Sequence, residues 1–298
     1  MSKKEMKKTE ARSWINKIQQ SQSEEYRQLC AKKLVSATSH LAFRYTQNTA
    51  FRACIVDTPP LEVSRVSYPP TDIVQTSLGR CNRAGSAVFY CTPQPYVAIL
   101  EVRPQKGDLV AVSQWDIKIP FAAKPIGYSN EELMIRDRGI PERIARRQAA
   151  YTPTFSYINN QFRKWFTCTS DEKYHLSSLI SEEMMRENLS TPRTPDDHDR
   201  FAIMYPSICF DKIPNSIGPQ DNFAFSTKAV DDGVLELSRV YMVHITNVIE
   251  QFSIIEYETV ARSIGMQNGK IIWMQIKQGD KTLGYWNGGN LNSYSKLK

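Results

Sequence analysis

Three side chains with complementary chemistry follow one another in residues 79–101: the guanidinium of Arg80, the phenol of Tyr90 and the carboxylate of Glu101. An arginine binds phosphate in a bidentate manner, a tyrosine packs on a flat ring, and a carboxylate in a partly dry pocket stabilises a developing positive charge. Together they suit a ligand that contains phosphates, a sugar and a flat ring. On spacing alone, however, an ordinary strand–turn–helix with a solvated Arg and Glu is the preferred interpretation, because three-residue patterns match by chance.

Two other positions carry chemistry that a site could use. Arg52 lies between Phe51 and Ala53, so on a strand its side chain is on the face opposite these neighbours, either at the surface or in a cleft. Ser207 ends the apolar run 201–207 in a Tyr-Pro-Ser sequence. Its hydroxyl either enters a cleft or takes part in a simple turn, and taken alone the turn is the preferred interpretation.

The hydrophobic pattern predicts the elements that must position these side chains. Residues 1–42 lack Gly and Pro and predict two helices, with Ser23 at the break or cap between them. After Thr92 and Pro93 the chain is either a helix that begins there or a strand, and both place Glu101 beside apolar residues. The Pro-rich loop 57–70 is expected to cover a site. Further strands are expected at 43–56, 87–90, 109–115, 201–205, 222–225 and 235–248, further helices at 130–150, 160–168 and 172–187, and a C-terminal β-hairpin from 271–276 and 282–286.

The composition is that of an average globular protein, with 298 residues, 41% hydrophobic and 23% charged. No apolar run is long enough for a membrane helix, and the first residues are polar, so we expect a cytoplasmic protein with no membrane partner. The six cysteines form no CxxC pair and the four histidines do not cluster with them. We therefore expect free thiols and no metal site.

The formal net charge of +7 reflects two basic clusters. Such clusters are found in nucleic-acid-binding modules, and they also suit an anionic small ligand. Solvated helical faces are the preferred interpretation, because aromatic residues are not interleaved with the charges in the sequence. The clusters consist of Lys3, Lys4, Lys7 and Lys8, and of Arg136, Arg138, Arg143, Arg146 and Arg147.

The ordered combination of these residues resembles the RES domain, a family named for its Arg, Glu and Ser. The resemblance spans about residues 43–248. The best-known members are the toxins of RES–Xre toxin–antitoxin pairs, and they degrade NAD by hydrolysis or phosphorolysis of the nicotinamide–ribose bond; some are ADP-ribosyltransferases. The set that carries the resemblance is Arg52, Gly79-Arg80 with Asn82, Tyr90, Glu101, and Tyr205-Pro206-Ser207 followed by Asn222-Phe223-Ala224.

The resemblance implies a role for each matching residue. Glu101 would stabilise the oxocarbenium-like transition state, and Arg52 and Arg80 would hold the pyrophosphate. Tyr90 would pack on the nicotinamide or ribose, and Ser207 would bind the nicotinamide side. Two more residues are assigned to NAD binding: Asn82 from the Gly-Arg motif, and Tyr68 as the counterpart of the family's other tyrosine, although the preceding loop is longer here.

The resemblance also implies the architecture and the partners. It predicts an α+β fold with an ADP-ribosyltransferase-like core of two packed, mainly antiparallel sheets and flanking helices at residues 43–250. A helical extension at 1–42 and an extension with a β-hairpin at 251–298 would be additional, and Cys81 replaces the usual tryptophan. NAD is the expected substrate, without a metal. A protein antitoxin or inhibitor and a homodimer are left open, and nucleic acid is not expected.

Three other functions remain open at this point. The first is ADP-ribose transfer to a protein, which breaks the same bond and differs only in the acceptor. The second is a basic nucleic-acid-binding module without catalysis, which predicts salt-sensitive binding that does not depend on Glu101. The third is an inactive structural relative, which predicts no loss of NAD.

Overall fold

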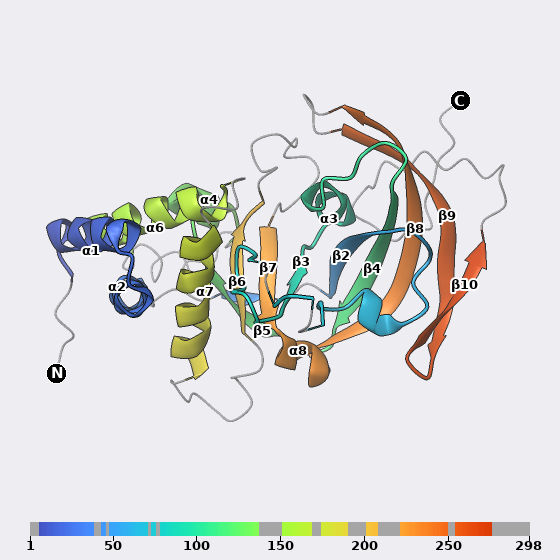
Figure 1. Cartoon of the computed structure of the whole chain (residues 1–298), viewed down its shortest axis with the longest axis horizontal. Coiled ribbons are helices and arrows are strands. Elements are labelled where there is room, and N and C mark those ends of the chain that lie inside the picture. Colours follow the sequence, from blue (N-terminus) through green and yellow to red (C-terminus); the bar gives the residue numbers. More distant parts are fainter. Residues whose placement is uncertain are drawn as a thin grey trace. The chain divides into compact units, whose positions relative to one another are not determined.

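The computed structural model shows an α+β chain with two mainly antiparallel sheets, as the sequence predicted (Figure 1). It describes residues 6–38, 43–45, 48–70, 73–75, 78–136, 151–168, 174–189, 201–207, 221–249 and 254–275.

The chain divides into two compact units, each made of three segments of the sequence. Unit 1 consists of Met1–Tyr45, Thr71–Val88 and Phe121–Pro206, and unit 2 of Thr46–Pro70, Phe89–Pro120 and Ser207–Lys298.

Unit 1 is mainly helical. Its first helix, α1, buries Ala11, Ile15 and Ile18, whose spacing of four and three residues puts them on one face. Helix α2 begins at the cap predicted from the sequence, because the hydroxyl of Ser23 accepts a hydrogen bond from the amide of Tyr26 at 3.3 Å. The helices of unit 1 are α1 (Lys8–Gln20), α2 (Glu24–Ser36), α4 (Asn130–Arg136), α6 (Pro153–Phe166) and α7 (Tyr174–Leu189).

Three strands belong to unit 1 and lie in the order β1-β5-β6. Strands β1 and β5 are antiparallel, and β5 and β6 are parallel. The turn after β5 is held against α6: the amide of Gly127 donates to the side chain of Asn159 at 2.7 Å, and Arg163 donates to the carbonyl of Gly127 at 2.8 Å. The bounds are β1 (Phe43–Tyr45), β5 (Phe121–Pro125) and β6 (Phe201–Pro206).

Unit 2 is built around a five-stranded antiparallel sheet in the order β10-β9-β8-β4-β2. Strand β8 alternates between two buried faces: Tyr241 and Val243 point into one apolar cluster, while Val240 and Met242 point into another. Strands β3 and β7 are neighbours in the other sheet. The strands of unit 2 are β2 (Thr49–Val56), β3 (Val88–Cys91), β4 (Leu109–Ile117), β7 (Asp221–Ser226), β8 (Leu235–Ile249), β9 (Ile254–Gln267) and β10 (Lys270–Gln275), and its helices are α3 (Pro95–Glu101) and α8 (Thr227–Asp231).

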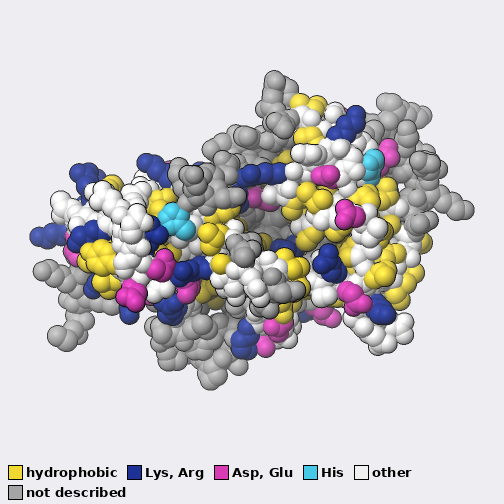
Figure 2. Space-filling model, viewed as in Figure 1, with side chains coloured by type: hydrophobic (Ala, Val, Ile, Leu, Met, Phe, Trp, Pro, Cys, Tyr) yellow, Lys and Arg dark blue, Asp and Glu magenta, His cyan; other side chains and the backbone are white. Residues whose placement is uncertain are grey.

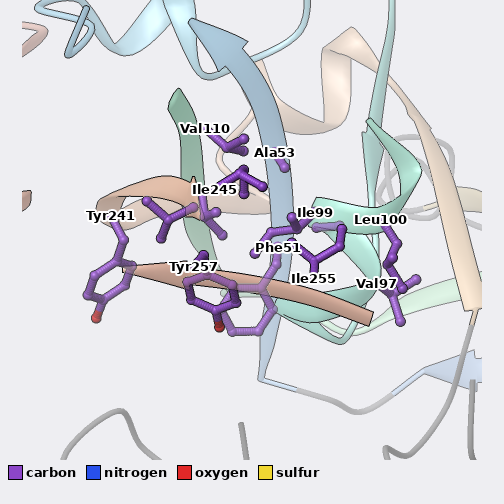
Figure 3. Packing of buried hydrophobic residues seen from close by; sticks show 13 residues of the cluster. Phe51, Ala53, Val97, Ile99, Leu100, Val110, Tyr241, Ile245, Ile255 and Tyr257 are labelled. Atoms are coloured by element: carbon purple, nitrogen blue, oxygen red, sulfur yellow. The ribbon is translucent and has the colours of Figure 1, made fainter. Parts of the chain in front are cut away.

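Helix α3 packs on one face of this sheet. Figure 3 shows Val97, Ile99 and Leu100 of α3 in the same cluster as Phe51 and Ala53 of β2, and all five are buried. A helix of only seven residues is stabilised mainly by this tertiary packing rather than by its own hydrogen bonds. The cluster therefore fixes the position of the C-terminal end of α3.

The start of α3 differs from the prediction. The backbone of Thr92 pairs with Phe51, donating to its carbonyl at 2.9 Å and accepting from its amide at 2.7 Å. Thr92 is therefore held in an extended conformation, and the helix begins at Pro95 with Gln94 as its N-cap residue. Of the two conformations that the sequence left open for the segment ending at Glu101, the helix is the one observed.

The C-terminal hairpin of the described chain joins β9 and β10. Its turn contains Asn268 and Gly269, which both have positive φ, of 52° and 74°, as a type I′ hairpin turn requires. The strand expected at 271–276 is observed as β10, whereas its expected partner at 282–286 lies outside the described residues.

The Pro-rich loop 57–70 packs on this hairpin. The indole of Trp273 donates to the carbonyl of Pro60 at 2.8 Å, and the amide of Ile271 donates to the carbonyl of Leu61 at 2.8 Å. Val66 of the same loop is fully buried in the cluster that also contains Ile271. These contacts anchor the loop within unit 2.

Candidate functional site

Glu101 is at the centre of a buried polar cluster in unit 2. The hydroxyl of Ser207 donates to its Oε1 at 2.5 Å, and the amide nitrogen of Asn222 donates to the same oxygen at 2.7 Å. Ser207 and Asn222 are only 1% and 5% exposed. The structure thus brings together Glu101 and Ser207, to which the sequence analysis gave roles, and Asn222, which it named without a role.

Each member of this cluster lies at or near the end of a regular element. Glu101 is the last residue of α3, one turn after the buried Val97. Ser207 directly follows β6, and Asn222 is the second residue of β7. Glu101 is only partly buried, whereas Ser207 and Asn222 are almost fully buried.

The two donors determine how the carboxylate of Glu101 can act. Both are neutral, so they stabilise negative charge on Oε1 without cancelling it. Because both meet Oε1 from side chains that are almost fully buried, they fix the rotation of the carboxylate and hence the direction of Oε2. A carboxylate held in this manner needs no reorganisation when positive charge develops nearby.

Asn222 had no predicted role of its own, although the sequence contained a signal for one. Its amide is followed by the buried Phe223 and Ala224 in a strand that has buried neighbours on both faces. An amide buried among apolar residues requires hydrogen-bond partners. The sequence thus indicated that Asn222 has a partner, but not that the partner is Glu101.

Arg52 forms a second group of contacts in unit 2. Its Nη1 donates to the carbonyl of Tyr90 at 3.2 Å, and its guanidinium carbon lies 5.8 Å from the ring centre of Phe89. Its Nε is buried, and no hydrogen-bond acceptor for it is found in the described part of the chain. The ring of Phe89 also packs edge-on against Trp115, with ring centres 4.8 Å apart.

The Arg52 group and the Glu101 cluster are distinct. Phe51 packs with α3, and Arg52 is its neighbour on β2, so the Arg52 side chain is on the opposite face of that strand. Tyr90 alternates in the same way with the buried Phe89 on β3, and its own side chain is partly exposed. Within unit 2 the structure thus places Arg52 against the backbone carbonyl of Tyr90 and the ring of Phe89, and Glu101 beside Ser207.

Tyr68 is bound to an acidic residue that the sequence did not indicate. Its hydroxyl donates to Oδ1 of Asp231, the last residue of α8, at 2.7 Å. This hydrogen bond raises the pKa of Tyr68, because the neutral phenol is the donor and the nearby carboxylate disfavours a phenolate. The hydroxyl is therefore engaged with α8.

Arg80 and Asn82 lie in unit 1, in a segment that packs against α7. Arg80 is 9% exposed, and its guanidinium carbon lies 5.8 Å from the ring centre of Tyr174. Asn82 is 7% exposed, and its carbonyl accepts from the amide of Gly79 at 3.0 Å. Cys81 lies between these two residues in the sequence. Burial raises the pKa of its thiol to about 12, although a hydrogen bond with Ser181 and the charge of Arg80 lower it.

The basic surface of the N-terminal helices includes aromatic rings. Figure 2 shows Lys and Arg side chains gathered over α1. Lys8 and Arg12 lie over the ring of Tyr157 at 5.5 and 5.9 Å, and Lys17 lies over Trp14 at 4.6 Å. Two aromatic rings, one on α1 and one on α6, are thus in contact with basic side chains of α1. In the other basic cluster Arg136 ends α4, and the remaining members, Arg138, Arg143, Arg146 and Arg147, lie outside the described residues.

Among the described residues, no group of three or more His, Cys, Asp and Glu side chains is arranged to hold a metal ion. The five cysteines in the described ranges, Cys30, Cys54, Cys81, Cys91 and Cys168, are not bridged. In the same ranges no helix combines the length and the apolar character needed to cross a membrane.

Comparison with known proteins returned no matching family model, no matching curated protein and no matching solved structure.

Proposed function

We propose that this protein cleaves the bond between nicotinamide and ribose in NAD, with Glu101 as the catalytic carboxylate. The observation that carries the proposal is the pair of hydrogen bonds from Ser207 and Asn222 to Oε1 of Glu101. It is supported by the resemblance of the ordered residue set to RES domains.

The chemistry follows from the leaving group. The bond between the anomeric carbon of the ribose and the ring nitrogen breaks, and its electron pair stays with the nitrogen, so nicotinamide leaves as a neutral molecule. The ribose becomes oxocarbenium-like, and a fixed carboxylate stabilises this positive charge. Water or phosphate then attacks the anomeric carbon and loses a proton. No strong general acid is required, because the leaving group needs no proton.

The other residues are assigned to binding. Arginine suits the pyrophosphate because its planar guanidinium matches two phosphate oxygens, and we assign this role to Arg52 and Arg80. The buried Nε of Arg52, for which the described residues supply no acceptor, supports its assignment. Tyr90 is assigned to the nicotinamide or ribose, and Asn82 and Tyr68 to the remaining contacts. In the structure the Tyr68 hydroxyl donates to Asp231.

The test is nicotinamide release from NAD by purified protein, with Glu101→Gln beside the wild type. This change keeps the size of the side chain and its ability to accept from Ser207, but removes the charge. We expect kcat to fall by about 100- to 1,000-fold, the usual cost of removing one electrostatic contact to the transition state. The matched control is Glu258→Gln on β9, which removes the same charge from an exposed position and should leave kcat unchanged.

Assays with and without phosphate separate hydrolysis from phosphorolysis, and NAD labelled in the adenylate part detects transfer to protein. Equal nicotinamide release by the wild type and Glu101→Gln would refute the assignment of Glu101. Absence of release and of transfer by the wild type would refute the proposed function.

A further inference from the structure

A single arginine connects three separate segments of unit 1. Nη2 of Arg83 forms an ion pair with Glu24 at 2.7 Å, and its Nη1 forms one with Glu182 at 3.1 Å. Glu24 is the first residue of α2, and Glu182 lies in the third turn of α7. Arg83 itself belongs to residues 78–88, which we call the Arg80 segment.

The Arg80 segment contacts α7 at three successive levels. Arg80 lies over the ring of Tyr174, Cys81 forms a hydrogen bond with Ser181, and Arg83 pairs with Glu182. The backbone of the segment closes on itself through the amide of Ser86, which donates to the carbonyl of Arg83 at 3.0 Å. A displacement of Arg83 is therefore transmitted to Arg80 through a short, folded stretch of chain.

The Glu182 end of the bridge is itself held. Arg186 donates to Glu182 at 2.8 Å and to Glu183 at 2.6 Å, and Glu183 is only 6% exposed. Glu24, by contrast, is 48% exposed and lies in the first turn of α2. The ion pair between Arg83 and Glu24 is thus a direct contact of the N-terminal helices with the segment.

We infer that Arg83 is a positioning residue: through Glu24 and Glu182 it fixes the Arg80 segment, so that the N-terminal helices set the orientation of the Arg80 guanidinium toward an anionic group such as a pyrophosphate. This inference rests on the proposed function for the identity of the ligand. It gives residues 1–42 a role in ligand binding, whereas from the sequence they were only an extension.

The first test compares Glu24→Gln with Glu25→Gln. Both changes remove one negative charge from the first turn of α2, so both have the same effect on the helix dipole. Of these two carboxylates, it is that of Glu24 that pairs with Arg83 in the described structure. We expect faster hydrogen exchange in residues 79–88 for Glu24→Gln and no change for Glu25→Gln.

The same variants are then compared in NAD turnover. Because the ion pair is partly exposed, its loss should raise KM for NAD by a factor of about 2–5, with kcat unchanged, since Glu101 is not affected. Arg83→Gln loses both ion pairs and should raise KM more than Glu24→Gln. Arg83→Lys keeps the charge but not the planar fork that reaches two carboxylates, and its KM should lie between those of the wild type and Arg83→Gln.

The possible results distinguish failure of this inference from failure of the proposed function. Unchanged exchange in Glu24→Gln, or equal effects of Glu24→Gln and Glu25→Gln, would overturn the inference. A fall in kcat with KM unchanged would also overturn it, because it would show that the bridge does not act through binding. If the wild type releases no nicotinamide, the proposed function fails, and the exchange comparison still decides whether α2 fixes the Arg80 segment.

Discussion

The hydrogen bonds around Glu101 can be tested by replacing one of its donors with an acceptor. Asn222→Asp keeps the shape of the side chain but replaces the donor, 2.7 Å from Oε1 of Glu101, with a second carboxylate. The variant loses a hydrogen bond to a charged group, worth about 1.5–3 kcal/mol. It also gains a repulsion of about 4 kcal/mol for two charges about 4 Å apart at an effective dielectric constant near 20.

These two effects are not fully additive, because Glu101 is partly exposed and one of the two carboxyls can take up a proton. We therefore expect the free energy of unfolding of unit 2 to fall by about 2–4 kcal/mol at pH 8. The repulsion raises the pKa of one carboxyl in the folded state above its unfolded value of about 4. The folded state then binds more protons than the unfolded state, so the penalty decreases as pH is lowered toward 5.

The assay is urea unfolding of the wild type, Asn222→Asp, and the double variant Asn222→Asp with Glu101→Gln, each at pH 8 and pH 5. In the double variant the amide introduced at position 101 can donate to the carboxylate introduced at position 222. The hydrogen bond is thus restored with donor and acceptor exchanged. We expect the double variant to recover most of the lost stability at pH 8 without recovering NAD turnover. If it is no more stable than Asn222→Asp, the two side chains are not in contact and the reasoning is refuted.

Three further predictions concern the turn at Gly127, the phenol of Tyr68 and the thiol of Cys81. Gly127→Ala should lower the free energy of unfolding by about 2–4 kcal/mol, because φ is +77° and a Cβ would lie 2.9 Å from the backbone of α6. Gly233→Ala, where φ is +72° and the space around the Cβ is open, should lower it by only about 1 kcal/mol, and thermal unfolding measures both. Asp231→Asn should lower the pKa of Tyr68, measured by NMR of labelled tyrosine; in the wild type the contribution of Tyr68 to stability is complete below about pH 10 and is lost as pH rises through its raised pKa. Cys81, buried and with its pKa raised to about 12, should react with iodoacetamide at pH 8 only as fast as the protein unfolds, which peptide mass spectrometry measures; rapid labelling of the folded protein would contradict its burial.

The sequence predicted most of the elements, but it missed β5 and β9 and misplaced the start of two helices. Thr92-Pro93 and Thr152-Pro153 are the same dipeptide, a favourable helix start. A helix begins at Pro153, where Thr152 accepts from the amide of Phe155 at 3.1 Å, although the sequence placed the start at residue 160. No helix begins at Pro93, because Thr92 pairs with a strand from another part of the chain.

The candidate site was predictable in its residue types but not in its connections. The combination of Arg, Glu and Ser identified Glu101 and Ser207, and the structure places them in contact. Asn222 and Asp231 had no predicted partners, since hydrogen bonds between residues far apart in the sequence leave no local pattern. The dipeptide Asn268-Gly269, in contrast, is a strong local hairpin signal; the prediction did not use it and paired residues 271–276 with 282–286 instead of with β9.

The separation of the Glu101 cluster along the chain has a consequence for synthesis on the ribosome. Ser207 and Asn222 lie 106 and 121 residues after Glu101. During translation α3 is therefore complete long before either donor exists, and the pair of contacts that orients the carboxylate is complete only after β7 has emerged. A nascent chain that stops before Ser207 lacks both donors, and one that stops between Ser207 and β7 still lacks Asn222, so the competent arrangement requires a chain that extends past the start of β7.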